Sequence, residues 1–304
     1  MKSKMAYFNS RAFFTGIGIS LICSISSTDF WISGIIGTIL GVIALMLIKK
    51  KTENKIINSI SGFILASIAS IILVNMGHSL YLRETPVFIL SIFPIIAAVI
   101  ISKSGKKPLN MVLHIFFIYS IVLFFLKIAG LYPHINIENL HPLLKSNFKT
   151  ILWGGILYAI IGIVPILTLN DTFDKKNIIL NYVLSSITIL VVSFLAVSVL
   201  GIKEVNIYRY PEYLVLKRVE FLDFINNVDS FFNFAIITDL LFTMANGIKA
   251  VKIDNTFIKI LIPTGILAVT VYTCFTNWPL LFLYKNLPII FIFLLIITLI
   301  PKKS

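Results

Sequence analysis

Asp239 is the residue of this sequence that most clearly could do chemistry, because it lies inside a long apolar segment. A charge at the centre of a bilayer costs about 2.5 to 3.5 kcal/mol even on a lenient insertion scale, so such residues usually serve a ligand, an ion or a partner charge. Phe232, Thr243 and Asn246 recur around Asp239 at helical spacing, which places them on one helix face. We expect this face to look into a helix bundle, with Asp239 and Thr243 in a binding site.

Lys127 lies in another apolar segment, one heptad after Ser120. It is the intramembrane cation that we expect to be able to neutralise Asp239. The favoured alternative is that its ammonium reaches the outer interface, since a loop follows about six residues later. His114, near the expected cytoplasmic end of the same segment, fits an interface or packing role better than a proton relay.

Glycines supply a second candidate feature. Thr15, Gly16 and Gly18 interrupt the first apolar segment, and Gly162 with Pro165 interrupts the sixth. Helices broken at corresponding positions of two five-helix halves are typical of a ligand site at the membrane midplane, because the freed backbone groups can coordinate a ligand. Close helix packing is the alternative, since glycine commonly permits it in membrane helices.

Enzyme motifs are largely absent from the sequence. It contains no HExxH, no phosphate-binding glycine loop with lysine and no nucleophile elbow. Two cysteines, Cys23 and Cys274, and four histidines are scattered without the spacing of a metal site. We therefore expect no catalytic residue, no metal and no cofactor.

The composition indicates a membrane protein. Of 304 residues, 58% are hydrophobic and only 13% are charged, and the mean hydropathy is +0.97, well above the values of soluble domains. Apolar runs of about 17 to 25 residues, the length that crosses a bilayer as a helix, recur along the chain. They predict ten spans in one polytopic membrane domain over 1–304: 11–27, 31–48, 57–77, 86–102, 110–131, 151–169, 177–200, 222–247, 257–275 and 285–301.

The basic residues predict the orientation. Lys and Arg number 17 on one set of alternate loops, where we place Arg11, and 8 on the other set. The first side holds the whole net charge of +13, which predicts that both termini are cytoplasmic. This charge attracts anionic lipid, and nucleic acid is not an expected partner.

Two connections on the outer side are long, at 132–150 and 201–221. Both mix charges and contain Tyr, Pro or His. They suit short interfacial helices or a partner-facing surface, and a solvated connector is the alternative.

Several motifs are similar to those of a known family. Residues 210–229 read YPEYLVLKRVEFLDFINNVD, residues 134–144 read HINIENLHPLL, WGG stands at 153–155 and DFW at 29–31. With these motifs, in this order, the chain resembles the GerAB family, the permease-like B subunits of spore germinant receptors in the amino acid–polyamine–organocation superfamily.

The resemblance implies a LeuT-like fold, with ten helices in a five-plus-five inverted repeat and broken first and sixth helices. It implies a pocket between the first, third, sixth and eighth helices, which on this chain includes the broken regions at Gly16 to Gly18 and Tyr158 to Gly162. It also implies assembly with A-type and C-type receptor subunits in the spore inner membrane. Family members often carry an FGE-like segment in the sixth helix, but this chain reads IGI at 161–163 and lacks the acid.

The expected function is therefore a receptor subunit that binds a small germinant, such as an amino acid, within the membrane bundle. The expected ligand-binding residues are Thr15, Gly16, Gly18, Tyr158, Gly162, Asp239 and Thr243. The alternative is a secondary transporter of amino acids or amines coupled to H⁺ or Na⁺ through Asp239, since one fold hosts both roles. The missing acid favours sensing, and a scaffold subunit with a degenerate pocket is a third possibility.

Overall fold

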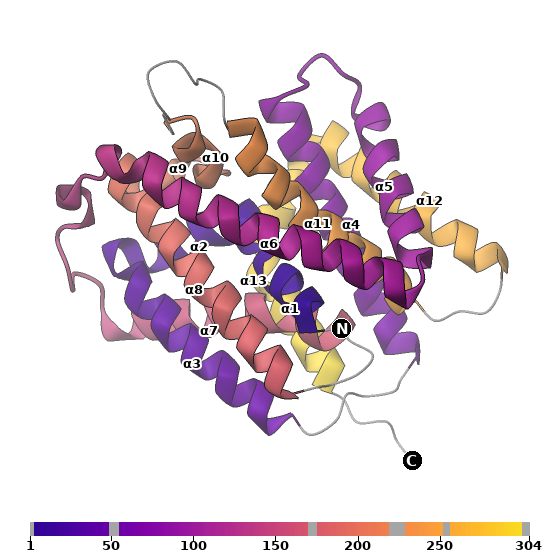
Figure 1. Ribbon diagram of the computed structural model, residues 1–304, viewed down its shortest axis with the longest axis horizontal. Coiled ribbons are helices and arrows are strands. Elements are labelled where there is room, and N and C mark those ends of the chain that lie inside the picture. Colours follow the sequence, from indigo (N-terminus) through magenta and orange to yellow (C-terminus); the bar gives the residue numbers. More distant parts are fainter. Residues whose placement is uncertain (1–2, 49–54, 170–174, 219–228, 252–255, 300–304) are drawn as a thin grey trace.

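The described part of the chain is built from helices. The computed structural model describes residues 3–48, 55–169, 175–218, 229–251 and 256–299, and no strand occurs among them. In chain order the elements are α1 (Ser3–Arg11), the π-helix η1 (Phe14–Gly18), α2 (Ile19–Ser26), the 3₁₀ helix η2 (Ser27–Asp29), α3 (Phe30–Leu47), α4 (Lys55–Leu80), α5 (Val87–Lys103), α6 (Lys106–Leu131), the 3₁₀ helices η3 (Tyr132–His134) and η4 (Ile137–Leu140), α7 (Phe148–Leu169), α8 (Lys175–Leu200), α9 (Ile202–Ile207), α10 (Pro211–Leu216), α11 (Asp229–Ala250), α12 (Thr256–Phe275) and α13 (Asn277–Leu299) (Figure 1). The predicted all-α class is confirmed.

Within the described residues, helices lie over each of the ten predicted spans, the first of which is divided among α1, η1 and α2. Residues 222–228 of the eighth predicted span and 300–301 of the tenth lie outside the described residues. In the described chain, five stretches are long and apolar enough to cross a membrane: Ile19–Leu47, Lys55–Leu80, Lys107–His134, Phe148–Leu167 and Lys175–Leu200. Val87–Lys103, Leu261–Phe275 and Lys285–Thr298 are shorter apolar helices. These lengths are consistent with a membrane protein, whereas ten crossings in a five-plus-five repeat stay a prediction.

The first helix begins earlier than the predicted span 11–27. α1 starts at Ser3 and already buries Tyr7. The chain then leaves α-helical geometry, because the Gly18 amide donates to the Phe13 carbonyl at 2.8 Å, a five-residue step. The interruption predicted for the first helix is therefore present, as the π-helix η1.

The interruption predicted for the sixth helix is wrong. α7 runs from Phe148 to Leu169 without a break and contains Pro165. Gly162 keeps its helical geometry and serves packing, since a Cβ there would lie 2.9 Å from the Tyr182 ring and 3.2 Å from Ser10 Oγ. The side chains of α8 and α1 therefore occupy the space beside this glycine.

Glycines also bring other helices into close contact. A Cβ on Gly37 of α3 would lie 2.6 Å from the carbonyl oxygen of Gly155 in α7. Likewise, a Cβ on Gly62 of α4 would lie 2.6 Å from the carbonyl oxygen of Gly247 in α11, and the reverse distance is also 2.6 Å. Small residues allow helices to approach in this way where apolar burial against lipid supplies little driving force.

The first long outer connection is fixed by Asp29 of η2. This carboxylate is fully buried and accepts hydrogen bonds from the Leu144 amide at 2.6 Å and the Ser146 amide at 2.8 Å. The connection contains η3 and η4. Asp29 thus ties the loop between α6 and α7 to the outer end of the first helix.

The second long outer connection contains α9 and α10, which confirms the expectation of short helices. α10 is not a solvated connector, because Glu212, Tyr213 and Leu216 are buried. Residues 219–228, the latter part of the motif at 210–229, lie outside the described residues.

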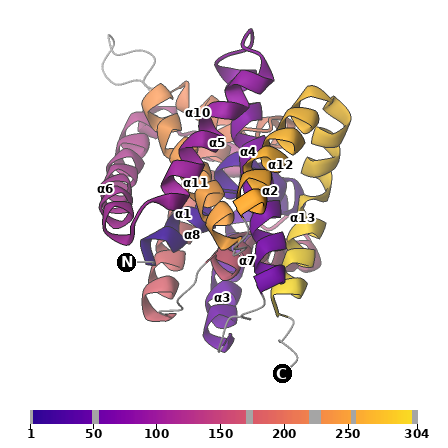
Figure 2. The ribbon, with the colours of Figure 1, turned by 90° about the vertical axis from the view of Figure 1, so that its right-hand side faces the viewer.

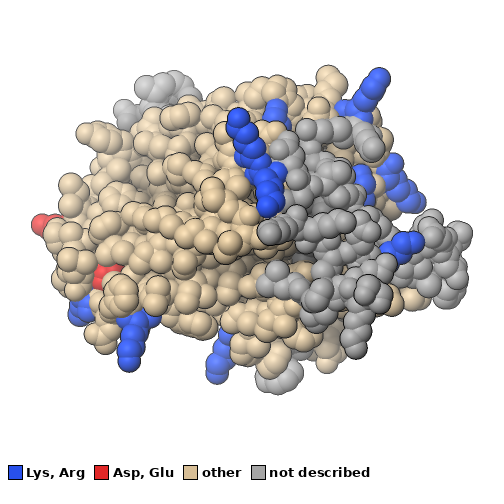
Figure 3. All heavy atoms as spheres, turned by 90° about the horizontal axis from the view of Figure 1, so that it is seen from below, with Lys and Arg blue, Asp and Glu red and all other residues tan. Residues whose placement is uncertain are grey.

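α6 lies on one side of the molecule, and α12 and α13 lie on the other (Figure 2). Seen from below, Lys and Arg side chains project at many points, and the visible Asp and Glu side chains lie together at one edge (Figure 3).

Candidate functional site

An ion pair between α1 and α11 lies in the interior of the helix bundle. Arg11 Nη2 lies 3.1 Å from Asp239 Oδ2, and the two side chains are 4% and 0% exposed. Arg11 is the last residue of α1 and stands just before η1. Asp239 and Thr243 are buried, so the prediction that their helix face looks inward is confirmed.

The Arg11 guanidinium contacts three helices. Besides Asp239 of α11, it donates to Ser120 Oγ of α6 at 2.7 Å and to the Tyr7 hydroxyl of α1. The placement of Arg11 among the inner-loop cations is therefore wrong. Because α1 extends back to Ser3, Arg11 falls within the first helix and inside the bundle.

Lys127 of α6 forms an ion pair with Glu212 of α10. Its ammonium donates to Glu212 Oε1 of α10 at 2.6 Å, and both side chains are buried. Whether Lys127 meets Asp239 was open from the sequence, and the ion pair that the structure gives it is with Glu212. The Lys127 side chain is buried rather than extended to the surface. α10 folds inward and brings Glu212, a residue of an outer connection, to the buried ammonium.

More polar groups line the contact between α1 and α11. Thr243 Oγ1 donates to Asn9 Oδ1 at 3.2 Å, and Asn246 is also buried. Within the described chain, Asn9 Nδ2 and Asp239 Oδ1 have no hydrogen-bond partner. Oxygen and nitrogen atoms therefore converge here in a setting suited to a charged or strongly polar group. The side chain of Phe232, expected on the same face, lies outside the described residues.

The other predicted ligand residues lie around η1. Thr15 Oγ1 donates to the Arg11 carbonyl at 3.3 Å, and the Phe14 ring packs on the Tyr158 ring with 4.5 Å between centroids. The Tyr158 hydroxyl donates to the Ser186 carbonyl at 3.0 Å, so it is already bonded within the protein. Gly16 belongs to η1.

α1 connects the two groups of predicted residues. Ser10 of α1 faces Gly162 of α7, and Asn9 faces Thr243 of α11. The structure therefore gathers the predicted residues around one helix, although Thr15 and Tyr158 are engaged in internal hydrogen bonds.

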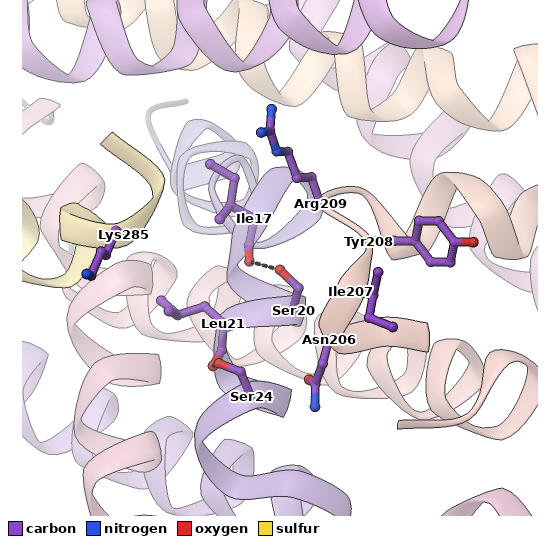
Figure 4. A pocket seen from close by; sticks show the side chains of 9 residues that line it. All are labelled: Ile17, Ser20, Leu21, Ser24, Asn206, Ile207, Tyr208, Arg209 and Lys285. Carbon is purple, nitrogen blue, oxygen red and sulfur yellow. Dashed lines mark hydrogen bonds between the residues drawn. The ribbon is translucent and has the colours of Figure 1, made fainter. Parts of the chain in front are cut away.

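A groove of about 180 Å³ lies against the C-terminal half of the first helix, formed by η1 and α2 (Figure 4). Its lining comes from η1 and α2, from the end of α9 and the link to α10, and from α13: Ile17, Ser20, Leu21, Ser24, Asn206, Ile207, Tyr208, Arg209 and Lys285. Figure 4 shows the Arg209 and Lys285 side chains on different sides of the first helix. The two cations and the Asn206 amide suit a small molecule that carries a carboxylate, whereas the Ser20 and Ser24 hydroxyls already donate to the Ile17 and Leu21 carbonyls.

Several of these residues are absent from the expected site. From the sequence, Arg11 and Lys285 stand at the ends of predicted spans and are counted with the loop cations, whereas Arg209 and Glu212 fall in the predicted connection 201–221. An apolar stretch beginning at residue 5 of the sequence could have revealed that Arg11 lies within a helix. No pattern in the sequence brings Arg209 and Lys285 to the first helix.

Comparison with known proteins finds similarity to a protein named for spore germination. No model of a known protein family matches the chain. Over 234 residues the chain is 25% identical to "Putative spore germination protein YfkT" of Bacillus subtilis (strain 168), a match that covers 69% of this chain and 65% of that protein's length. The chain is thus similar to a protein named for spore germination, and its apolar helices are consistent with a membrane protein.

Proposed function

We propose that this chain is the membrane-embedded subunit of a spore germinant receptor and binds a small nutrient, such as an amino acid. Similarity to YfkT supports the germination role. The observation that carries the binding role is the groove beside the interrupted first helix.

The groove has the size and chemistry for an amino acid. A cavity of about 150 Å³ accommodates benzene, so about 180 Å³ suits a ligand of similar or slightly larger size. Arg209 and Lys285 offer positive charge to a carboxylate, and the Asn206 amide offers hydrogen bonds. The Ser20 and Ser24 hydroxyls donate to the Ile17 and Leu21 carbonyls, so they offer acceptor oxygens to the ammonium of an amino acid.

Binding here would act on the first helix. Ser20 and Ser24 belong to α2, which η1 separates from α1. A ligand that binds one arrangement of α1 and α2 more tightly than another shifts the population toward it. In the proposed mechanism, A-type and C-type receptor subunits detect this shift, and no net transport is needed.

The proposal includes a membrane setting. The chain would lie in the spore inner membrane, with ten crossings in a five-plus-five arrangement and both termini cytoplasmic.

A secondary transporter of amino acids or amines is the competing function. Coupling to H⁺ or Na⁺ through Asp239 would require this carboxylate to exchange its cation. Its contact with Arg11 supports sensing over transport, because the guanidinium already supplies the positive charge.

Ligand-dependent thermal unfolding tests the proposal. The purified chain in detergent is heated with each of the common L-amino acids in turn, and a bound amino acid raises the Tm. Arg209→Gln and Lys285→Gln should abolish this rise. Lys203→Gln should retain it, because Lys203 is an exposed cation of α9 that does not line the groove.

Uptake of the same amino acid into proteoliposomes separates the two functions. Binding without uptake is expected of a receptor subunit, whereas uptake driven by an ion gradient would make the chain a transporter. If no amino acid raises the Tm, the proposal of an amino-acid ligand is wrong.

A further inference from the structure

Two buried ion pairs lie in the helix bundle of the described chain, and the charges balance within each pair. Arg11 pairs with Asp239 at 3.1 Å and Lys127 pairs with Glu212 at 2.6 Å, and none of the four side chains is more than 5% exposed. The four residues come from α1, α11, α6 and α10. Two positive and two negative charges give this part of the bundle a net charge of zero.

An unpaired carboxylate at the position of Asp239 would need a cation. Buried charges within a membrane are paired or mark an ion path, because a low-dielectric interior penalises an isolated charge. In many transporters an exchangeable H⁺ or Na⁺ meets this need. At Asp239 the need is met by Arg11, whose guanidinium is covalently part of the chain and keeps its proton.

The surroundings of Asp239 contain ligands for a small cation. Asp239 Oδ1 has no hydrogen-bond partner within the described chain, and Asn9 Oδ1 and Thr243 Oγ1 lie at the same contact between α1 and α11. Carboxylate, amide and hydroxyl oxygens are the donors that hard cations prefer.

The guanidinium is itself held in place from three helices. Arg11 Nη1 donates hydrogen bonds to Ser120 Oγ of α6 and to the Tyr7 hydroxyl of α1. Arg11 Nη2 forms the ion pair with Asp239 Oδ2 of α11. Besides these residues, the charged groups that act on the pair are Glu212 and Lys127, which neutralise each other.

We propose that Arg11 is a permanent counterion that takes the place of a coupling cation at Asp239. The chain therefore folds and changes conformation without binding Na⁺ or exchanging a proton at this site. Removal of the guanidinium exposes a latent cation site formed by Asp239, Asn9 and Thr243. This inference does not depend on the proposed nutrient, since it concerns the ion requirement of the bundle.

The test compares the Tm of the purified full chain in NaCl, KCl and choline chloride at equal ionic strength, from mildly acidic to mildly alkaline pH. The wild-type Tm should be the same in all three salts. The Tm of Arg11→Gln should fall below that of the wild type in choline chloride at alkaline pH. It should rise again when Na⁺ is added or the pH is lowered. Arg11→Lys, which keeps a positive charge, should remain insensitive to the salt.

The double variant Arg11→Gln/Asp239→Asn is the decisive control. It removes both charges and should again be insensitive to cation and pH. If Arg11→Gln alone does not fold, recovery of folded protein in the double variant supports the proposal.

Two results would overturn the inference. The first is specific stabilisation of the wild type by Na⁺ that Asp239→Asn abolishes, which would make Asp239 a cation site in the presence of Arg11. The second is an Arg11→Gln variant with the wild-type Tm at every pH and in every salt, which would show that Arg11 does not neutralise Asp239. Neither result depends on whether an amino acid binds the groove.

Discussion

The ammonium of Lys127 lies 2.6 Å from a carboxylate oxygen of Glu212, although 85 positions separate the two residues in the chain. The contact joins α6 to α10, a short helix within an outer connection. Both side chains are almost fully buried, so each charge depends on the other for its compensation.

Glu212→Gln should destabilise the protein strongly. It leaves the Lys127 ammonium buried without a full negative charge, and breaking one side of a buried pair costs about 3 to 5 kcal/mol. The measurement is the unfolding temperature in detergent. Glu204→Gln is the matched control, because the Glu204–Arg218 pair is half exposed and spans 3.8 Å, so its loss should cost less than about 1 kcal/mol. Equal losses in the two variants would contradict the assignment.

Asp239→Asn should impair function while leaving membrane insertion intact. It leaves the buried guanidinium of Arg11 without a carboxylate, but the length and polarity of the apolar segment hardly change. The amount of protein in the membrane fraction and the germination response of spores that carry the variant are the two measurements. A response equal to that of the wild type would contradict a functional role for Asp239.

Asp29→Asn should loosen the connection between α6 and α7. The carboxylate accepts two backbone hydrogen bonds, and the Asn amide group cannot accept both with the same geometry. Loss of a buried, charge-assisted hydrogen bond costs about 1 to 3 kcal/mol. Proteolysis of the loop should accelerate in the variant. Glu138→Gln, at an exposed position of the same connection, should leave the rate unchanged.

Gly62→Ala should separate α4 from α11. The added methyl would lie 2.6 Å from the Gly247 carbonyl oxygen and 2.9 Å from the Ala250 Cβ, and overpacking of this kind costs about 1 to 3 kcal/mol. Gly77→Ala in the same helix is the control, because a Cβ there meets no atom within 4 Å. Its Tm should stay the same or rise slightly, since alanine favours a helix over glycine by about 0.5 to 1 kcal/mol. An equal drop in both variants would show that close packing at Gly62 is not the cause.

The interruptions predicted in two helices show how the same residue type can have two roles. Glycine at position 18 accompanies a real π-helix, whereas Gly162 lies in an unbroken helix beside the Tyr182 ring. Glycine both weakens a helix and permits close packing, so its presence alone does not distinguish the two outcomes. The neighbours of each glycine decide which occurs.

The sequence by itself determined where helices form and which residues must be covered. Backbone polar groups in a bilayer have to be satisfied within the segment, so apolar runs of spanning length become helices, and a charge such as Asp239 must face inward. Only the tertiary structure decided that Arg11 neutralises Asp239, that Glu212 neutralises Lys127 and that Arg209 and Lys285 reach one groove. A sequence shows that a buried charge needs a partner, but the rotation and packing of distant helices determine which side chain lies close enough to be that partner.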